Sequence, residues 1–483
     1  MTKRGRKGAL RGLTWPAIAV GCVLVVGATS GFGPPAEVVD VHRSAAAPIP
    51  AFARLYGTAC STCHNAAPKL NVLGEAFRLN GYRLPDSELL ERRDDPIPLG
   101  SEPWKDLWPR AIWPSELPGL APFALRVQSD FGVTRDEEGE TATTFRFPHE
   151  IYLLAGAPLG AGIGAFFESE WTRENGFEVL QAKIAFQNPI TALPSGLLNL
   201  WVGQQNLYLF TFADRQIDRA ARQKFAWQGF RSSDVEAFAS EGGAELRSEG
   251  DFQLATPQPA IEINGLITDR LYYGFGVAQG TAAQSDDDNT RKDVYYKVRY
   301  KFGGLNLRGK YDPGGGPVPG AGGQLLDRSL IIEHFGYFGG QPVGGGVDDD
   351  HRSFGVSVRA LQGPLDVGVG YVRSHHDSPW GLQISGALET SSWFGKLEYM
   401  GLPWLIGSVK LDRFQVTLPS EAVGPAFDAG RSEKTRIMPG VVFLVRQNIR
   451  AVIEAELFLK DTRTNQASFR RPHALWVRLD YSF

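Results

Sequence analysis

Hydrophobic and polar residues alternate with a period of two along many short segments from Phe123 to the C-terminus. Between Val294 and Phe302, for example, Val, Tyr and Phe alternate with Tyr, Lys and Arg. Successive side chains of a β-strand point to opposite faces, so this pattern predicts strands with one apolar face and one polar face. The same alternation occurs in residues 123–128, 180–186, 354–359 and 449–460.

The region 123–483 contains about sixteen such candidate strands, which is the size of a porin barrel. Strands of roughly ten residues with apolar side chains outside and polar side chains inside are typical of outer-membrane β-barrels. A soluble β-sandwich is the alternative, but it would turn its apolar faces inward and use shorter strands. We therefore predict an all-β fold, an antiparallel outer-membrane barrel wide enough to enclose a lumen.

The C-terminal residues agree with a barrel. Residues 473–483 read HALWVRLDYSF, and the alternate residues from Leu475 to Phe483 are apolar and share one face. This segment resembles the last strand of bacterial outer-membrane proteins, which ends in an aromatic residue that the assembly machinery reads.

The N-terminus has the pattern of a targeting segment. Its basic residues are Lys3, Arg4, Arg6, Lys7 and Arg11. An apolar stretch at 17–28 follows, too short to span a bilayer comfortably, and then small residues at 28–30. We predict a Sec-type signal peptide over residues 1–30. An uncleaved N-terminal anchor is the alternative.

Composition and charge narrow the class of protein. The 483 residues include only 3 cysteines, which excludes a disulfide scaffold, whereas 56 glycines and 11% aromatic residues favour strands and turns. The formal net charge is −3, and removal of the basic signal peptide would make the chain more acidic. We therefore expect no nucleic-acid partner.

The two cysteines outside the signal peptide belong to a motif with defined chemistry. Residues 60–64 read Cys-Ser-Thr-Cys-His, the C-x-x-C-H pattern of c-type haem attachment. Cys60 and Cys63 are spaced to form thioethers with the two vinyl groups of one haem, and His64 would be the proximal iron ligand. A redox dithiol or half of a zinc site is the alternative, but the adjacent histidine and the exported context weigh against both.

A short helix is predicted after the motif. Leu70, Leu73 and Phe77 recur at helical spacing and would pack on one face of the porphyrin, and Gly81 would end the helix. An ordinary amphipathic helix is the alternative. We assign residues 31–95 to a monohaem c-type module that holds one covalent haem c.

The sixth ligand of the haem iron is left open by the sequence. No histidine and no methionine lies between Asn65 and Pro148, which excludes His/Met ligation within the module. His42 is the preferred candidate. The other candidates are Lys69, a barrel histidine such as His149 or His334, a water molecule, or no ligand.

Residues 96–122 separate the module from the barrel. Prolines occur at positions 96, 98, 103, 109, 114, 118 and 122, a density that forbids a continuous helix or a central strand. We predict an extended strap. Its tryptophans, Trp104, Trp108 and Trp113, would pack against a neighbouring element or line the haem pocket.

Charged runs are predicted at the strand ends and in the lumen. The acidic runs 135–140, 286–288 and 348–350 are expected in loops, where they are either simply solvated or concentrate divalent cations near the pore mouth. Lys297, Arg299 and Lys301 share the polar face of one strand and are expected in the lumen.

The order of haem module, strap and barrel resembles the fused monohaem cytochrome c–porin family, which includes outer-membrane iron oxidases. The resemblance rests on IPAFAR at 49–54, CSTCH at 60–64 and LGEAFRLNGY at 73–82. It is specific over residues 49–85 and only architectural beyond them.

The resemblance implies a function. In that family the haem module is a plug in the barrel, and electrons from extracellular donors, notably Fe(II), pass to periplasmic cytochromes. Cys60 and Cys63 carry over as attachment residues and His64 as the proximal ligand. No iron-binding residue carries over.

Two hypotheses follow for this chain. The first is electron transfer across the outer membrane, with Fe(II) oxidation and a periplasmic electron-carrier cytochrome as partner. The second is a transport porin whose haem plug is structural, sensory or gating. A peroxidase-like activity is favoured only if the iron is five-coordinate.

Overall fold

The computed structural model describes most of the region after residue 122 and part of the region before it. The described residues are 51–56, 58–84, 97–98, 116–117, 123–135, 140–160, 162–210, 254, 257–280, 290–313, 315–316, 325–342, 347–378, 387–417, 431–446, 448–461 and 473–482. The predicted signal peptide 1–30, His42 and the three tryptophans of the strap lie outside them.

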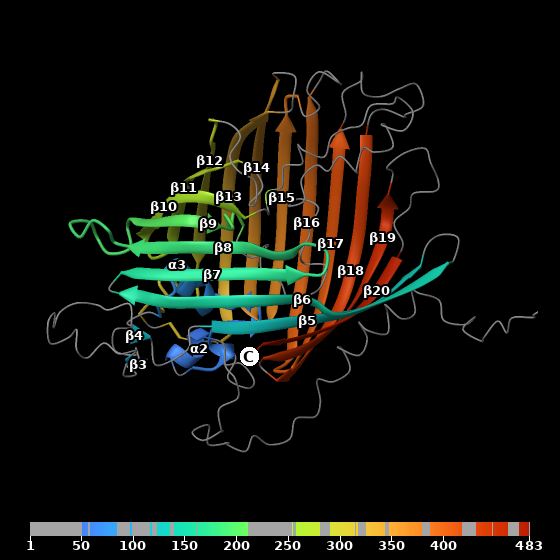
Figure 1. The fold of residues 1–483 in the computed structure, drawn as a ribbon, viewed down its shortest axis with the longest axis horizontal. Coiled ribbons are helices and arrows are strands. Elements are labelled where there is room, and N and C mark those ends of the chain that lie inside the picture. The colour runs from blue at the N-terminus through green and yellow to red at the C-terminus, as the bar shows by residue number, and fades with distance from the viewer. Residues whose placement is uncertain are drawn as a thin grey trace, which may run out of the picture.

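Within the described residues, sixteen antiparallel strands form a closed barrel (Figure 1), as the alternation predicts. Each strand pairs with the next along the chain, and β20 closes the barrel against β5. The strands are β5 (Phe123–Arg135), β6 (Thr141–Gly160), β7 (Ile163–Thr172), β8 (Gly176–Gln187), β9 (Asn199–Gln205), β10 (Gln258–Thr268), β11 (Leu271–Ala278), β12 (Asp293–Phe302), β13 (Asp327–Pro342), β14 (Asp348–Gly363), β15 (Leu365–His376), β16 (Leu388–Leu402), β17 (Leu405–Thr417), β18 (Arg431–Arg446), β19 (Ile449–Asp461) and β20 (His473–Ser482).

The two faces of the barrel differ as the sequence predicts. On β14, Phe354 and Val356 point outward and are 40% and 45% exposed, whereas Ser357 and Arg359 point inward and are buried. An outer surface of apolar side chains around a polar interior is the arrangement of a barrel that sits in lipid.

The basic residues of β12 face the lumen, as expected, and each has an acidic partner on β10 or β13. Lys297 Nζ lies 2.9 Å from Glu262, Arg299 Nε lies 2.8 Å from Glu333, and Lys301 Nζ lies 3.0 Å from Asp327. These buried pairs compensate each other's charge, so the inner wall at β12 carries little uncompensated charge.

The connections differ between the two ends of the barrel. At one end five of the seven connections between the described strands have only one or two residues, namely 161–162, 269–270, 364, 403–404 and 447–448, and the other two are 188–198 and 303–326. At the other end the connections include the long segments 206–257, 279–292, 377–387 and 418–430. We call these the short-turn end and the long-loop end.

A segment that precedes the barrel lies inside it, next to the short-turn end. Helix α2 (Ala51–Tyr56) is followed by the 3-10 turn η1 (Cys60–Thr62), the strands β1 (His64–Ala66) and β2 (Lys69–Leu70), and helix α3 (Val72–Leu79). We call residues 58–84 the inner segment. Helix α2 contacts β6 near the start of the barrel (Figure 1). No helix among the described residues is long and apolar enough to cross a membrane.

Local sequence explains where α3 begins and ends. The side chain of Asn71 accepts a hydrogen bond from the backbone N–H of Gly74, which is the usual N-cap arrangement. Gly81 has φ of +67°, a left-handed conformation that favours glycine and stops the helix. The predicted helix is therefore confirmed, except that Leu70 belongs to β2 and precedes it.

The connection after β9 also enters the lumen. Leu207, Leu209 and Phe210 are buried directly after that strand. The ring of Phe210 lies 4.9 Å from that of Phe335 and 6.1 Å from that of Phe394, both on the inner wall. The inner segment and this connection therefore both occupy space inside the barrel.

The described part of the strap contains one small sheet. Strand β3 (Ile97–Pro98) pairs with β4 (Glu116–Leu117). Two extended pieces at these positions agree with an extended strap, while the rest of 96–122 lies outside the described residues.

Two sequence-based expectations are wrong. The acidic run 348–350 does not lie in a loop, because β14 already begins at Asp348, and the strand alternation turns Asp349 inward and its neighbours outward. His334 does not face the lumen either. It points outward on β13, where its Nε2 lies 2.9 Å from the hydroxyl of Tyr296, so it is no candidate for an iron ligand inside the barrel.

Candidate functional site

The C-x-x-C-H motif forms a compact turn at the start of the inner segment. The backbone N–H of Cys63 donates to the carbonyl of Cys60 at 3.2 Å, so the two cysteines lie on one 3-10 turn. Both thiols are free and half-buried. His64 follows at once and begins β1, which pairs with β2 through Leu70.

Helix α3 holds this turn in place through its first residues. The side-chain amide of Asn71 donates to the carbonyls of Ser61 and Thr62, each at 3.0 Å. Its backbone N–H donates to the carbonyl of Cys63 at 2.9 Å. A Cβ on Gly74 would overlap with that same carbonyl oxygen, so glycine is required for the close approach of helix and turn.

A cavity of about 180 Å³ lies between this turn and the barrel wall. Cys60, Cys63 and His64 all line it. Most of the other lining side chains are apolar, and the opposite wall belongs to β5, β6, β7, the turn at Asn448 and the end of β20. The cavity therefore brings the three motif residues together at the short-turn end of the barrel.

The protonation of the thiols bears on the alternatives for the motif. Burial raises the pKa of Cys60, and burial together with the nearby Cys60 raises the pKa of Cys63 to about 12. Such thiols are protonated at neutral pH, whereas redox-active cysteines are thiolates with a low pKa. In the part of the chain that the structure describes, no cluster with metal-ligand geometry includes either cysteine.

The donor groups at this cavity are those that a covalent c-type haem uses. Two thiols three residues apart and an adjacent imidazole face one apolar cavity, which is the donor set that c-type haem requires. Leu70 and Phe77 also line this cavity. Leu73 does not line the cavity and instead packs against the cluster formed by Val72, Leu305 and Leu361. The roles of these three residues in haem packing stay predictions.

Apart from the motif residues, the cavity offers few groups that bind iron. Among its described lining residues His64 is the sole histidine, and none is methionine or lysine. Lys69 points to the barrel wall, where its amino group contacts the carboxylates of Asp366 and Glu398. His149 lies on β6, with Nε2 3.1 Å from Glu150. The proposed sixth ligand His42 lies outside the described residues and stays a prediction.

Buried ion pairs attach the inner segment to the barrel. Lys69 Nζ lies 2.6 Å from Asp366, and Glu75 lies 2.6 Å from Arg359. Burial alone would raise the pKa of Glu75, but Arg359 and further lumen cations hold it below its ordinary value. Removing one member of such a pair leaves an uncompensated buried charge, so these pairs fix the position of the segment.

Aromatic rings join the inner segment to the wall beside the cavity. Tyr82 stacks between Phe52 and Phe166, with centroid distances of 5.7 and 4.9 Å. Phe77 meets Phe52 edge to face at 5.0 Å. The hydroxyl of Tyr56 donates to the carbonyl of Tyr82 at 3.2 Å. Aromatic pairs of this kind add to the stability that burial provides.

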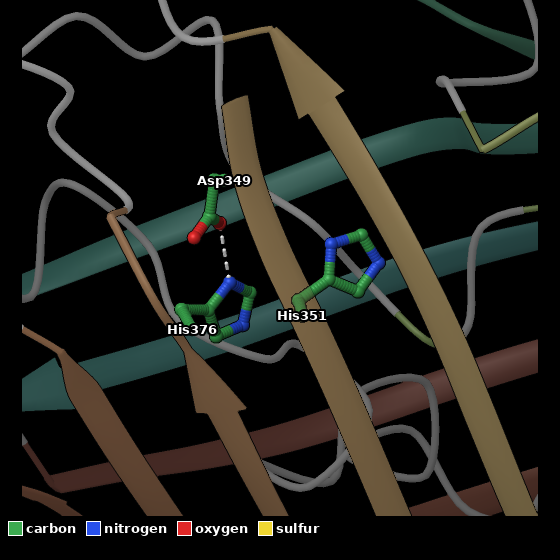
Figure 2. A group of neighbouring side chains, drawn as sticks. All are labelled: Asp349, His351 and His376. Atoms are coloured by element: carbon green, nitrogen blue, oxygen red, sulfur yellow. Dashed lines mark hydrogen bonds and ion pairs between the residues drawn. The ribbon is translucent and has the colours of Figure 1, made fainter. Parts of the chain in front are cut away.

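A second group of polar residues lies at the opposite end, and of its members only Asp349 was singled out from the sequence, as part of the acidic run 348–350. Asp349 and His351 are on β14 and His376 is on β15, with all three side chains buried in the lumen (Figure 2). The strand register makes His351 and His376 direct neighbours. The alternation of each strand shows which side chains face inward. It does not show the register of β14 against β15, and without that register the three residues could not be recognised as a group from the sequence.

The structure of this chain is similar to solved structures of outer-membrane porins and channels. No protein-family model and no curated protein matches the chain. Similar solved structures include OmpF of Salmonella typhi in complex with daunomycin, with 10% identity and a TM-score of 0.48, which covers 75% of this chain and 97% of that one. Another is an anion-selective porin of Comamonas acidovorans, with 13% identity and a TM-score of 0.48 over 75% and 98% of the two chains. The outer membrane channel DcaP of Acinetobacter baumannii has 12% identity and a TM-score of 0.42 over 75% and 96%.

Proposed function

We propose that this chain is an outer-membrane electron-transfer protein that holds one covalent haem c inside a porin-like barrel. The observation that carries the proposal is the shared cavity of Cys60, Cys63 and His64 at the inner wall of the barrel. The location follows from the closed barrel with its apolar outer face, since such a barrel satisfies its backbone hydrogen bonds in lipid.

The ends of the barrel support an orientation. Outer-membrane barrels have short turns on the periplasmic side and longer loops outside the cell. The cavity lies at the short-turn end, because its wall includes Asn448 in a short turn and Ser482 at the end of β20. Its position therefore favours access from the periplasm, where an electron-carrier cytochrome would dock.

The roles of the chain's residues follow from this geometry. Cys60 and Cys63 would hold the haem through thioethers and His64 would ligate its iron. Asn71 would keep the turn that carries all three in place. A c-type haem held there would supply one-electron chemistry, by which one electron could pass from a donor such as extracellular Fe(II), oxidised to Fe(III), to a periplasmic cytochrome.

The test has two stages, both on the full chain purified in detergent. Mass spectrometry and the haem absorption spectrum should reveal one covalent haem, which the double variant Cys60→Ser/Cys63→Ser loses. Stopped-flow mixing of the oxidised protein with Fe(II) under anoxic conditions should then reduce the haem rapidly. Absence of covalent haem would refute the proposal altogether, and a haem that Fe(II) fails to reduce would refute iron oxidation.

A transport porin is the second candidate, and the closed barrel with a polar lumen favours it. In that case the inner segment would be a structural, sensory or gating plug. Conductance across planar bilayers separates the two functions. A conduit for electrons needs no solute current, whereas a porin should pass ions or small solutes with the inner segment in place.

A further inference from the structure

The second polar group has the composition of a transition-metal site. Asp349, His351 and His376 each offer one ligand atom, and these three atoms lie within 4.8 Å of one another. Nδ1 of His376 donates to Oδ2 of Asp349 at 2.7 Å, and the two imidazole rings stack with centroids 5.3 Å apart. Figure 2 shows the three side chains on two adjacent strands, with the hydrogen bond between His376 and Asp349 as a dashed line.

The surrounding residues orient these ligands. The backbone N–H of Ser378 donates to Oδ1 of Asp349 at 2.9 Å, which leaves Oδ2 directed at His376. Asp293 lies on the other side, with Oδ2 3.5 Å from Nε2 of His351, and is itself held by the hydroxyl of Tyr337 at 2.5 Å. Hydrogen bonds of this kind to the ligating groups are typical of built metal sites.

We propose that Asp349, His351 and His376 bind one divalent first-row transition-metal ion in the lumen. Two imidazoles and one carboxylate suit Fe(II), Zn(II) and related ions, whereas Ca(II) and Mg(II) prefer oxygen ligands alone. The ion would replace the proton that His376 and Asp349 share, so binding releases a proton. Asp293 is placed to compensate the charge of the ion from the side of His351.

The position of this site separates it from the cysteine cavity. Asp349 and His351 are near the start of β14 and His376 ends β15, so the site lies at the long-loop end. Zinc binding there needs no haem, so the test of this site is independent of the electron-transfer proposal.

The probe is Zn²⁺ alone, which is redox-inert, added to the full chain in detergent and followed by isothermal titration calorimetry. We expect one tight site per chain and a Kd at least tenfold higher in each of Asp349→Asn, His351→Ala and His376→Ala. His375→Ala is the matched control, because His375 is next in sequence but contacts Asp377 and Glu389 away from the cluster. The control should bind Zn²⁺ like the natural chain.

Folding of the variants is checked by heat-dependent mobility in SDS gels, which distinguishes closed barrels from unfolded chains. If His351→Ala does not fold, His351→Gln keeps the size and polarity of the residue and still removes the imidazole. Absence of a tight zinc site in the natural chain would overturn the proposal. So would unchanged affinity in folded variants, or a loss of the site in His375→Ala.

Discussion

Gly74 allows helix α3 to approach the C-x-x-C-H turn closely, because a Cβ at this position would overlap with the carbonyl oxygen of Cys63. The motif itself could be recognised from the spacing of Cys60, Cys63 and His64, because that chemistry requires adjacent residues in sequence. The contacts that hold the motif in place could not be recognised from the sequence. The role of Asn71 depends on hydrogen bonds to Ser61 and Thr62, and such contacts appear only when the chain has turned back on itself.

Replacement of Gly74 tests the support directly. In Gly74→Ala the new Cβ meets the backbone carbonyl of Cys63, so helix and turn must move apart. We expect the haem content per chain, measured by the pyridine haemochrome assay, to fall at least severalfold. Gly395→Ala is the control, because the nearest atoms to its Cβ are 3.8 Å away. Equal haem content in both variants would contradict the role assigned to Gly74.

At the scale of elements, the attachment of the inner segment depends on charges that the sequence leaves unassigned. The alternation identifies the strands, and hence that Arg359 faces inward. It does not reveal that Arg359 pairs with Glu75, which is far away in sequence, because that pair depends on how deep the segment lies in the barrel. The same holds for Lys69, a candidate iron ligand from sequence that instead pairs with Asp366.

The pair predicts how the segment responds to pH. Because the folded-state pKa of Glu75 lies below its ordinary value of 4.5, the pair contributes fully above about that pH and is lost as the pH falls further. Glu75→Gln removes this pH dependence and leaves the buried charge of Arg359 less compensated. We expect the free energy of unfolding to fall by up to about 3–5 kcal/mol. Ion conductance should therefore rise on acidification in the natural chain and be raised already at pH 7 in the variant.

The control for this prediction is Glu389→Gln, which removes a carboxylate from the exposed pair with Arg373. Exposed pairs contribute little to stability. Its conductance should follow that of the natural chain at every pH. A Glu75→Gln variant that behaves in the same way would show that the pair does not hold the segment.

At the scale of the whole molecule, the fold class and the approximate strand number could be predicted because each strand repeats one simple pattern. What could not be predicted is the arrangement that depends on closure. Asp349, His351 and His376 become a cluster only through the register of β14 and β15. The segment from Leu207 to Phe210 likewise lies inside the barrel because its side chains pack against aromatic residues of distant strands on the inner wall.

The orientation of the two faces has a measurable consequence. Val356 lies midway along β14 on the outer face, so Val356→Arg places a charge near the middle of the lipid. We expect a loss of about 2–4 kcal/mol in the free energy of unfolding, measured in lipid vesicles with denaturant. Trp404→Arg, in a short turn at the barrel end, should cost about 0–1 kcal/mol. Equal costs would mean that Val356 does not face lipid.

The cavity of the cysteines shares its wall with the seam of the barrel. Arg126 on β5 and Ser482 on β20 both line it, and these strands are the two that meet when the barrel closes. The guanidinium of Arg126 also donates to Asp480 across that seam at 2.6 Å. A group that binds the cavity only when the seam is intact shifts the equilibrium toward the closed barrel by mass action. A group bound in this cavity would thus stabilise the pairing of β5 with β20. Its removal would first make the separation of these two strands easier.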